Sequence, residues 1–136
     1  MHFKFIVPGK PIGKQRIRVT RQGIAYTPKE TVSYENYIKE MFIYSGGKML
    51  SGAIGLTITA YLYIPKGTSK VKREKMLAGE IPATKRPDGS NILKVVEDSL
   101  NKIAYEDDSQ ITELAVIKVF GSEPKLEIEL KELAND

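Results

Sequence analysis

The segment from Asn91 to Ile103 constrains the fold more than any other, because its apolar residues recur with the period of an α-helix. At 100° per residue, an arc of about 80° holds four polar side chains: Asn91, Lys94, Asp98 and Asn101. The opposite side holds most of the apolar side chains: Ile92, Leu93, Val96, Leu100 and Ile103. We therefore predict a helix that packs its apolar face on a sheet and exposes a polar face.

The segments around this helix alternate between strand-like and helix-like patterns. Runs of β-branched and aromatic residues predict strands over 2–7, 16–20, 24–27, 53–64, 111–120 and 126–130, of which the last two form an antiparallel pair. A second helix is expected from Thr27, as its N-cap, to about Tyr44, and a third over 69–78. The second helix has an apolar face formed by Val32, Tyr34, Tyr37, Ile38, Met41 and Phe42. The order βββαβααββ predicts an α+β fold, a mixed β-sheet packed with helices, in one compact domain of residues 1–136.

Charge is distributed unevenly along the chain. Residues 1–86 carry 16 Lys and Arg against 5 Asp and Glu, whereas residues 87–136 carry 5 against 12. The basic part is typical of a polyanion-binding surface, and the acidic part has the groups to hold a cation, although charge that only confers solubility is an equal alternative. The residues expected to contact nucleic acid are Lys10, Lys14, Arg16, Arg18, Arg21, Lys70, Lys72, Arg73, Lys85 and Arg86.

Several kinds of protein are disfavoured by composition. The chain has no cysteine and a single histidine, His2, so disulfides, Cys-ligated zinc and a Ser-His-Asp triad are not expected. The N-terminus lacks the apolar core of a signal peptide. The longest apolar run, near Ile54–Ile64, is too short to span a bilayer, so we expect no membrane partner and a cytoplasmic location.

Acidic residues flank the first helix on both sides. Asp88 precedes it, while Asp107 and Asp108 follow it and lead directly into a strand. We expect this strand end to direct its carboxylates back to the N-terminus of the helix, where Asp88 and Lys94 lie. Two or three carboxylates suffice for Mg²⁺, which keeps several waters. Taken singly, each residue has a simpler explanation as a turn, a helix cap or an exposed ion pair.

The stretch KRPDGSNILKVVEDSLNKIAYEDDSQI, from Lys85 to Ile111, resembles the RusA family of Holliday junction resolvases. The family pattern runs approximately K-x-P-D-x-D-N-x-x-K, then a D-A-L-N-like segment, then D-D-x-Q-[IV]. The resemblance implies a dimeric, Mg²⁺-dependent endonuclease, with Mn²⁺ as a possible substitute, which makes paired nicks in four-way DNA junctions in a bacterial or phage-infected cell. It also implies roles for individual residues. Asp88 and Asp108 would be metal-binding catalytic acids and Lys94 the catalytic lysine, with support from Asn91, Asp98 and Asp107.

One position departs from the family pattern. Ser90 stands where a second acidic residue is expected, and a hydroxyl is a weaker Mg²⁺ ligand than a carboxylate. Asp107 or Asp98 could substitute, the enzyme could need more metal, or the protein could bind junctions without cutting them. A third possibility is an RNA- or protein-binding module whose acidic cluster is structural, with tyrosines that stack on bases. Tyrosines in such positions more often belong to the core.

Overall fold

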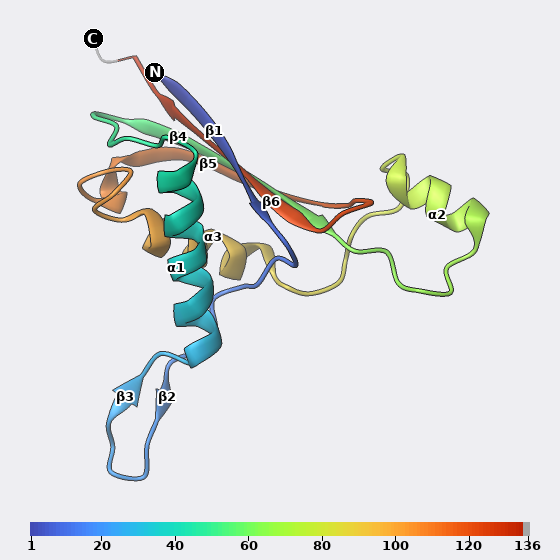
Figure 1. Ribbon diagram of the computed structural model, residues 1–136, viewed down its shortest axis with the longest axis horizontal. Helices are drawn as coiled ribbons and strands as arrows, with labels where there is room; N and C mark the ends of the chain where they lie inside the picture. The colour runs from blue at the N-terminus through green and yellow to red at the C-terminus, as the bar shows by residue number, and fades with distance from the viewer. Residues whose placement is uncertain (135–136) are drawn as a thin grey trace.

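The computed structural model describes residues 1–134, which form one mixed sheet, three α-helices and two projecting arms (Figure 1). The strands are β1 (His2–Pro8), β2 (Arg18–Val19), β3 (Ala25–Tyr26), β4 (Ile54–Leu62), β5 (Ile111–Phe120) and β6 (Lys125–Glu132). The helices are α1 (Lys29–Tyr44), α2 (Lys70–Leu77) and α3 (Gly89–Leu100), with a 3₁₀ turn, η1, at Asp108–Gln110. The predicted α+β class and the predicted order of elements are confirmed.

The main sheet has the order β1-β6-β4-β5. β6 runs antiparallel to both of its neighbours, β1 and β4, whereas β4 and β5 are parallel. The expected pairing of β5 with β6 is therefore wrong: the two strands run in opposite directions, but β4 lies between them. Parallel neighbours require a crossover, because the chain must return to the end of the sheet where the first strand began. The segment from residue 63 to 110, which contains α2, α3 and η1, makes this crossover.

The core lies on the face of the sheet covered by α1 and α3 (Figure 1). Strict alternation of side chains places one face of β4 and β6 inside: Ile54, Leu56, Ile58, Ala60, Leu62, Leu126, Ile128 and Leu130. The apolar side of α3 packs against them through Ile92, Val95, Val96 and Leu100. The amphipathic pattern of the α3 segment thus predicted its packing, with Val95 in addition.

The helix termini differ from the sequence expectations. In α1 the N-cap is Pro28, not Thr27, and Thr31 is fully buried while Val32 is exposed. α3 begins two residues before Asn91, with Asp88 as its N-cap, and ends at Leu100, not at Ile103. The early end follows from the loop that comes next. Ala104 and Tyr105 are completely buried, and the backbone amide of Leu50 donates to the Ala104 carbonyl at 2.8 Å.

Two basic arms project from the sheet and helices (Figure 1). One is the β2–β3 hairpin, on which the apolar side chains of Ile17, Val19 and Ile24 are more than 60% exposed. The other carries α2, capped by the Ser69 hydroxyl, which accepts a hydrogen bond from the Lys72 amide at 3.3 Å. Of α2, only Met76 is buried. No helix within residues 1–134 has the length and apolar character needed to cross a membrane.

The central strands should dominate stability. Ile58 is fully buried on β4, so Ile58→Ala leaves a cavity in the core and should lower the free energy of unfolding by about 2–4 kcal/mol. The matched control is Ile43→Ala on α1, where the side chain is 64% exposed and the loss should stay within about 0.5 kcal/mol. Urea denaturation followed by circular dichroism measures both values. Equal losses for the two variants would contradict the assignment of Ile58 to the core.

Candidate active site

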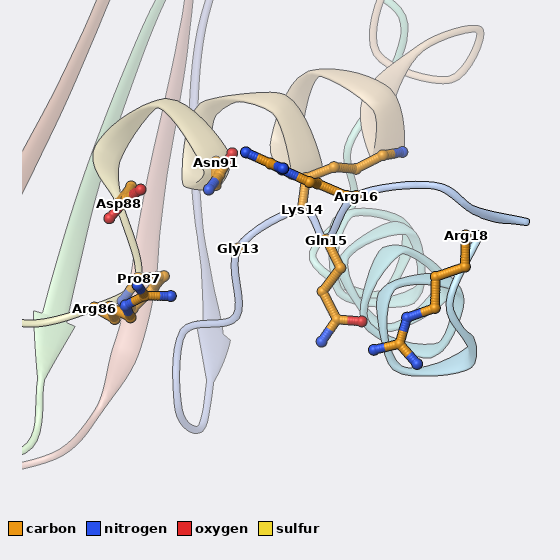
Figure 2. Close-up of a pocket in the computed structure, with 9 residues that line it drawn as sticks. All are labelled: Gly13, Lys14, Gln15, Arg16, Arg18, Arg86, Pro87, Asp88 and Asn91. Atoms are coloured by element: carbon orange, nitrogen blue, oxygen red, sulfur yellow. The ribbon is translucent and has the colours of Figure 1, made fainter.

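A polar cavity of about 560 Å³ opens at the N-terminal end of α3 (Figure 2). The loop after β1 forms one wall, and the segment that leads into α3 forms the other. Its principal side chains are Lys14, Arg16, Arg18, Arg86, Asp88 and Asn91. Three arginines therefore surround a space that one carboxylate also reaches, and such a space suits a phosphate group.

The loop after β1, which forms one wall, is hydrogen-bonded to α3 and to α1. The Lys14 amide donates to the Asn91 carbonyl at 2.9 Å, and the Gln15 amide donates to the Thr31 hydroxyl at 3.2 Å. A Cβ atom on Gly13 would lie 2.9 Å from the Asn91 Cβ and 3.1 Å from the Pro87 Cβ. Only glycine permits this approach, so Gly13 fixes the width of the cavity.

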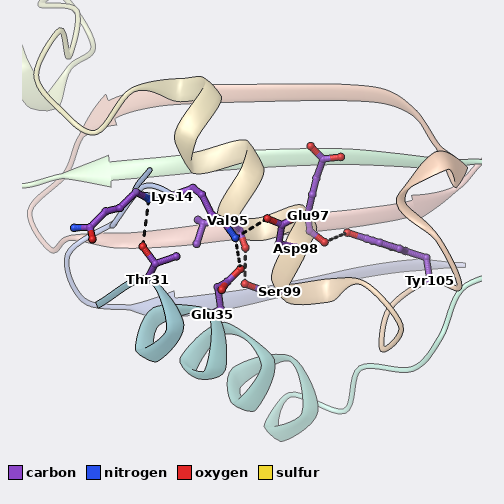
Figure 3. A network of polar contacts seen from close by, with 9 residues as sticks. Lys14, Thr31, Glu35, Val95, Glu97, Asp98, Ser99 and Tyr105 are labelled. Carbon is purple, nitrogen blue, oxygen red and sulfur yellow. Dashed lines mark hydrogen bonds and ion pairs between the residues drawn. The ribbon is translucent and has the colours of Figure 1, made fainter. Parts of the chain in front are cut away.

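Lys14 links three elements inside the protein (Figure 3). Its Nζ lies 2.8 Å from Asp98 Oδ2 on α3 and 3.1 Å from Glu35 Oε2 on α1. Burial on its own would lower the pKa of Lys14, but the hydrogen bonds and charges of Asp98 and Glu35 outweigh burial and raise that pKa above its ordinary value. The sequence suggested a DNA contact for Lys14 and metal support for Asp98. The structure places these two side chains against each other.

Asp88 lies at the end of a segment, residues 85–89, that contacts β5. The Lys118 side chain donates to the Lys85 carbonyl at 2.6 Å, and an added Cβ on Gly89 would lie 3.8 Å from Val116. The Lys85 ammonium sits 3.1 Å from the centre of the Tyr63 ring and donates to the Tyr63 carbonyl at 3.3 Å. Asp88 caps the helix by position only, because its side chain makes no capping hydrogen bond and its carboxylate faces the cavity (Figure 2).

The ten predicted DNA contacts fall into three groups. Lys14 and Lys85 are engaged with protein groups, as described above. Arg16, Arg18 and Arg86 line the cavity beside Asp88. The remaining five are exposed, one in the loop just after β1, one on the hairpin and three on α2: Lys10, Arg21, Lys70, Lys72 and Arg73.

Asp107 and Asp108 lie at the opposite end of α3. Asp107 caps η1: its Oδ2 accepts from the Ser109 amide at 3.0 Å, and hydrogen bonds from the Ser109 side chain and amide lower its pKa. Gln110 closes the turn by accepting from the Glu106 and Asp107 amides, and it donates to the Gly52 carbonyl at 3.0 Å. These bonds place η1 next to the start of β4.

Glu97 is a site residue that the sequence analysis missed. It is partly buried on α3, and burial, followed by the nearby charges of Asp108 and Asp98, raises its pKa. Burial and the same three carboxylates also raise the pKa of Tyr105, whose hydroxyl donates to the Glu97 carbonyl at 2.6 Å (Figure 3). A signal was present in the sequence, because Glu97 follows Ser90 by seven residues and so lies within about 20° of it around the helix.

The acidic residues are therefore split between the two ends of α3. A helix of 12 residues is about 18 Å long, with Asp88 before its first residue and Asp108 beside its C-terminal half. The expectation that the Asp108 carboxylate lies at the N-terminus of α3 is therefore wrong, because Asp108 lies near the other end of the helix. Ser90 and Lys94 are exposed along the helix between the two ends.

Both ends offer the hard oxygen donors that Mg²⁺ prefers. At the Asp108 end, Asn101 also has a buried side-chain oxygen with no hydrogen-bond partner among the described residues. Within residues 1–134, however, no three His, Cys, Asp or Glu side chains come close enough together to hold a metal ion. The donors fit the ion in kind, but they lie at separate ends of α3 in the described residues.

The Lys14 linkage gives a stability prediction. Lys14→Met leaves the Glu35 carboxylate, whose side chain is 16% exposed, without its cation and should cost about 1–3 kcal/mol of unfolding free energy. Lys10→Met, at an exposed position of the same loop, should cost less than about 0.5 kcal/mol. Thermal and urea denaturation compare them. If Lys14→Met were as stable as the control, the linkage would contribute nothing.

Comparisons with known proteins identify the family of this chain. The family model of endodeoxyribonuclease RusA matches residues 8–131, which include the cavity, α3 and η1. The chain is also 31% identical to the uncharacterized protein YqaN of Bacillus subtilis (strain 168) over 137 residues, which cover 96% of each chain. A match across nearly the whole fold, with the cavity and both acidic ends inside it, shows that this protein belongs to the RusA family of Holliday junction-resolving endodeoxyribonucleases.

Proposed function

We propose that this protein is a Mg²⁺-dependent, structure-selective endonuclease that resolves four-way DNA junctions by paired nicks, in the cytoplasm of a bacterial or phage-infected cell. The observation that carries the proposal is the cavity that Arg16, Arg18 and Arg86 line together with Asp88. Arginine forks hold phosphate oxygens in pairs, and the N-terminus of α3 adds its positive dipole end. A DNA phosphate bound there lies beside a potential metal ligand.

The chemistry is assigned to a small set of residues. Asp88, at the N-terminal end of α3, and Asp108, near its C-terminal end, are the carboxylates proposed as ligands for Mg²⁺, or for Mn²⁺ in its place. The bound ion would polarise the phosphodiester and lower the pKa of a water molecule. Lys94 is exposed on the face of α3 between the two acids and is placed to neutralise charge that develops on phosphoryl oxygens. Glu97, beside Asp108, offers the negative charge that Ser90 lacks.

The two arms are proposed to hold the DNA branches. The hairpin carries Arg18 and Arg21, and α2 carries Lys70, Lys72 and Arg73, all exposed. Contacts of this kind go to the phosphate backbone, so binding should depend on the shape of the DNA and weaken steeply with salt.

An alternative function rests on Ser90. This residue is exposed in the first turn of α3, where the family pattern has an acid. Loss of that charge would weaken metal binding while leaving the arms and the arginine cavity intact. The protein would then bind junctions and cut them slowly or not at all.

A cleavage assay separates the two functions. Purified protein is incubated with a labelled four-way junction and with linear duplex, in EDTA, Mg²⁺ or Mn²⁺. The enzyme should make paired nicks only in the junction and only with metal. Asp108→Asn should abolish cutting and leave junction affinity within about threefold, because it removes a metal ligand and no phosphate contact. Glu106→Gln, an exposed acid of the same loop, should cut normally. Tight metal-independent binding without any cutting would favour the alternative.

Restoring the missing acid gives a second test. Ser90→Asp should tighten Mg²⁺ binding and raise the cleavage rate at low Mg²⁺, since it adds a carboxylate at the N-terminus of α3. Ser90→Ala serves as the control and should match the wild-type protein if the hydroxyl is not a ligand. Isothermal titration with Mn²⁺ and cleavage rates across a Mg²⁺ series are the measurements. No change in either quantity for Ser90→Asp would remove position 90 from the metal site.

A further inference from the structure

The β2–β3 hairpin exposes apolar side chains that the core does not use. Val19 on β2 and Ile24 in the turn have 65% and 63% of their surfaces in solvent, and Ile17, just before β2, has 64%. Tyr26 on β3 is 45% exposed. Single exposed apolar residues are common on protein surfaces, but a group of them on one projecting element indicates an interaction site. These four residues are called the apolar ribbon below.

The hairpin holds these side chains in a fixed arrangement. The Thr20 amide donates to the Ile24 carbonyl at 2.9 Å, and the Ile24 amide donates to the Thr20 hydroxyl at 3.1 Å. In the strand register Tyr26 lies opposite Arg18, so these two side chains share one face of the hairpin. Val19 follows Arg18 and points to the other face, because successive side chains of a strand alternate. The apolar ribbon therefore presents apolar surface on both faces.

The charge of this part of the chain selects a polyanion as the partner. Residues 9–28 contain five Lys and Arg and no Asp or Glu. Two of these basic residues, Arg18 and Arg21, lie on the hairpin and are exposed. A second copy of the hairpin would bring like charges together, which is unfavourable. Nucleic acid combines what the hairpin needs, because its phosphates are negative and the flat faces of its bases suit apolar contact.

We propose that the apolar ribbon contacts the faces of bases at the branch point of a four-way DNA junction, while Arg18 and Arg21 hold the phosphates around it. Wedging apolar side chains between the base pairs of a continuous duplex costs stacking energy. At a branch point four duplex ends meet, so each terminal base pair has a face that no neighbour in its own arm covers, and opening costs less. The apolar ribbon therefore favours branched DNA over linear DNA.

The hairpin follows directly from the loop that lines the polar cavity, so the two surfaces are adjacent (Figures 1 and 2). Arg16 and Arg18 line that cavity with Asp88, and Ile17 lies between the two arginines in the sequence. From Arg18 to Gln22 a strand extends about 13 Å, the length of about four base-pair steps. A phosphate in the cavity is thus within a few nucleotides of the bases at the apolar ribbon. The inference rests on the proposed function for its substrate and adds a physical basis for choosing junctions over duplex.

Binding assays without the apolar side chains test this contact. Val19→Ser combined with Ile24→Ser should weaken junction binding about tenfold and change binding to a linear duplex of the same sequence less than about twofold, because only the junction buries the two side chains. Fluorescence anisotropy in EDTA measures both affinities without any cutting. Ile43→Ser, an equally exposed position on α1, is the matched control and should bind both DNAs like the wild-type protein. Val19→Ile combined with Ile24→Leu should retain the junction preference.

A phosphate contact gives a different pattern. Arg21→Gln should weaken binding to junction and duplex alike and lower the salt dependence of both. If the double serine variant also lost affinity equally for both DNAs, or bound both like the wild-type protein, the inference would be overturned. A change of its oligomeric state without DNA, seen by sedimentation velocity, would assign the apolar ribbon to protein association and overturn it as well. Circular dichroism should show an unchanged melting temperature, because Val19 and Ile24 lie outside the core.

A second measurement observes the bases directly. 2-Aminopurine fluoresces more strongly when it is unstacked, and in Mg²⁺ the arms of a junction stack in pairs. Placed at the branch point, the probe should brighten about twofold or more when the non-cutting Asp108→Asn protein binds, whereas a probe one helical turn into an arm should not change. Adding Val19→Ser and Ile24→Ser should remove this rise at saturating protein.

The fluorescence result and the cleavage result are separable. Absence of a rise at the branch point, or a rise that persists without the two apolar side chains, would overturn the inference. If the wild-type protein shows the junction-specific apolar contact but cuts no junction with Mg²⁺ or Mn²⁺, the proposed cleavage fails and the contact at the branch point stands.

Discussion

The parallel pairing of β4 with β5 determines where every proposed catalytic group lies. A parallel neighbour obliges the chain to travel back along the sheet, and α3 is the element that makes the return. Asp88 therefore enters α3 at one end of β5, and Asp108 leaves the return path at the other end. The apolar face of α3 anchors this path on the sheet through residues that are completely buried. The separation of the acids is thus a consequence of topology, and side-chain rearrangement cannot remove it.

The basic residues of the chain divide into those that hold the protein together and those that face outward. Lys14 bridges α1 and α3, Lys118 holds the segment before Asp88, and Lys85 rests on Tyr63. Arg16, Arg18 and Arg86 line the cavity, and Arg21 lies on the hairpin, while Arg73 is exposed on α2 beside the exposed lysines Lys70 and Lys72. The roles of the three engaged lysines and of the three cavity arginines match the chemistry of the two side chains. A guanidinium fork suits phosphate oxygens, while a flexible ammonium reaches isolated carbonyl and carboxylate oxygens.

The sequence allowed the elements and their order to be predicted, because helical and strand periodicities are local properties. It predicted the apolar face of α3, the first and last residues of β5, and Ser69 as the residue at which α2 begins. Sheet order was not accessible in this way, since the placement of β4 between β5 and β6 depends on contacts between distant segments. The ion pairs of Lys14 and the proximity of Glu97 to Asp108 also depend on contacts between distant segments, so the sequence did not predict them. The motif around Asp88 and Asp108 revealed the family, while the distance between the acids depended on the direction of α3 relative to β5.

The β2–β3 hairpin stands apart from the core. Among residues 1–134 its two strands pair only with each other, and its apolar residues lie in solvent. Two-stranded ribbons of this kind have little stability of their own, so substitutions along the hairpin leave the energetics of the main sheet almost unchanged. Apart from the side chains proposed to contact DNA, the hairpin can therefore accept substitutions that the buried strands cannot tolerate. Relatives of this protein can diverge in this arm, and in whatever it contacts, while they retain the same fold and the same pair of acidic ends.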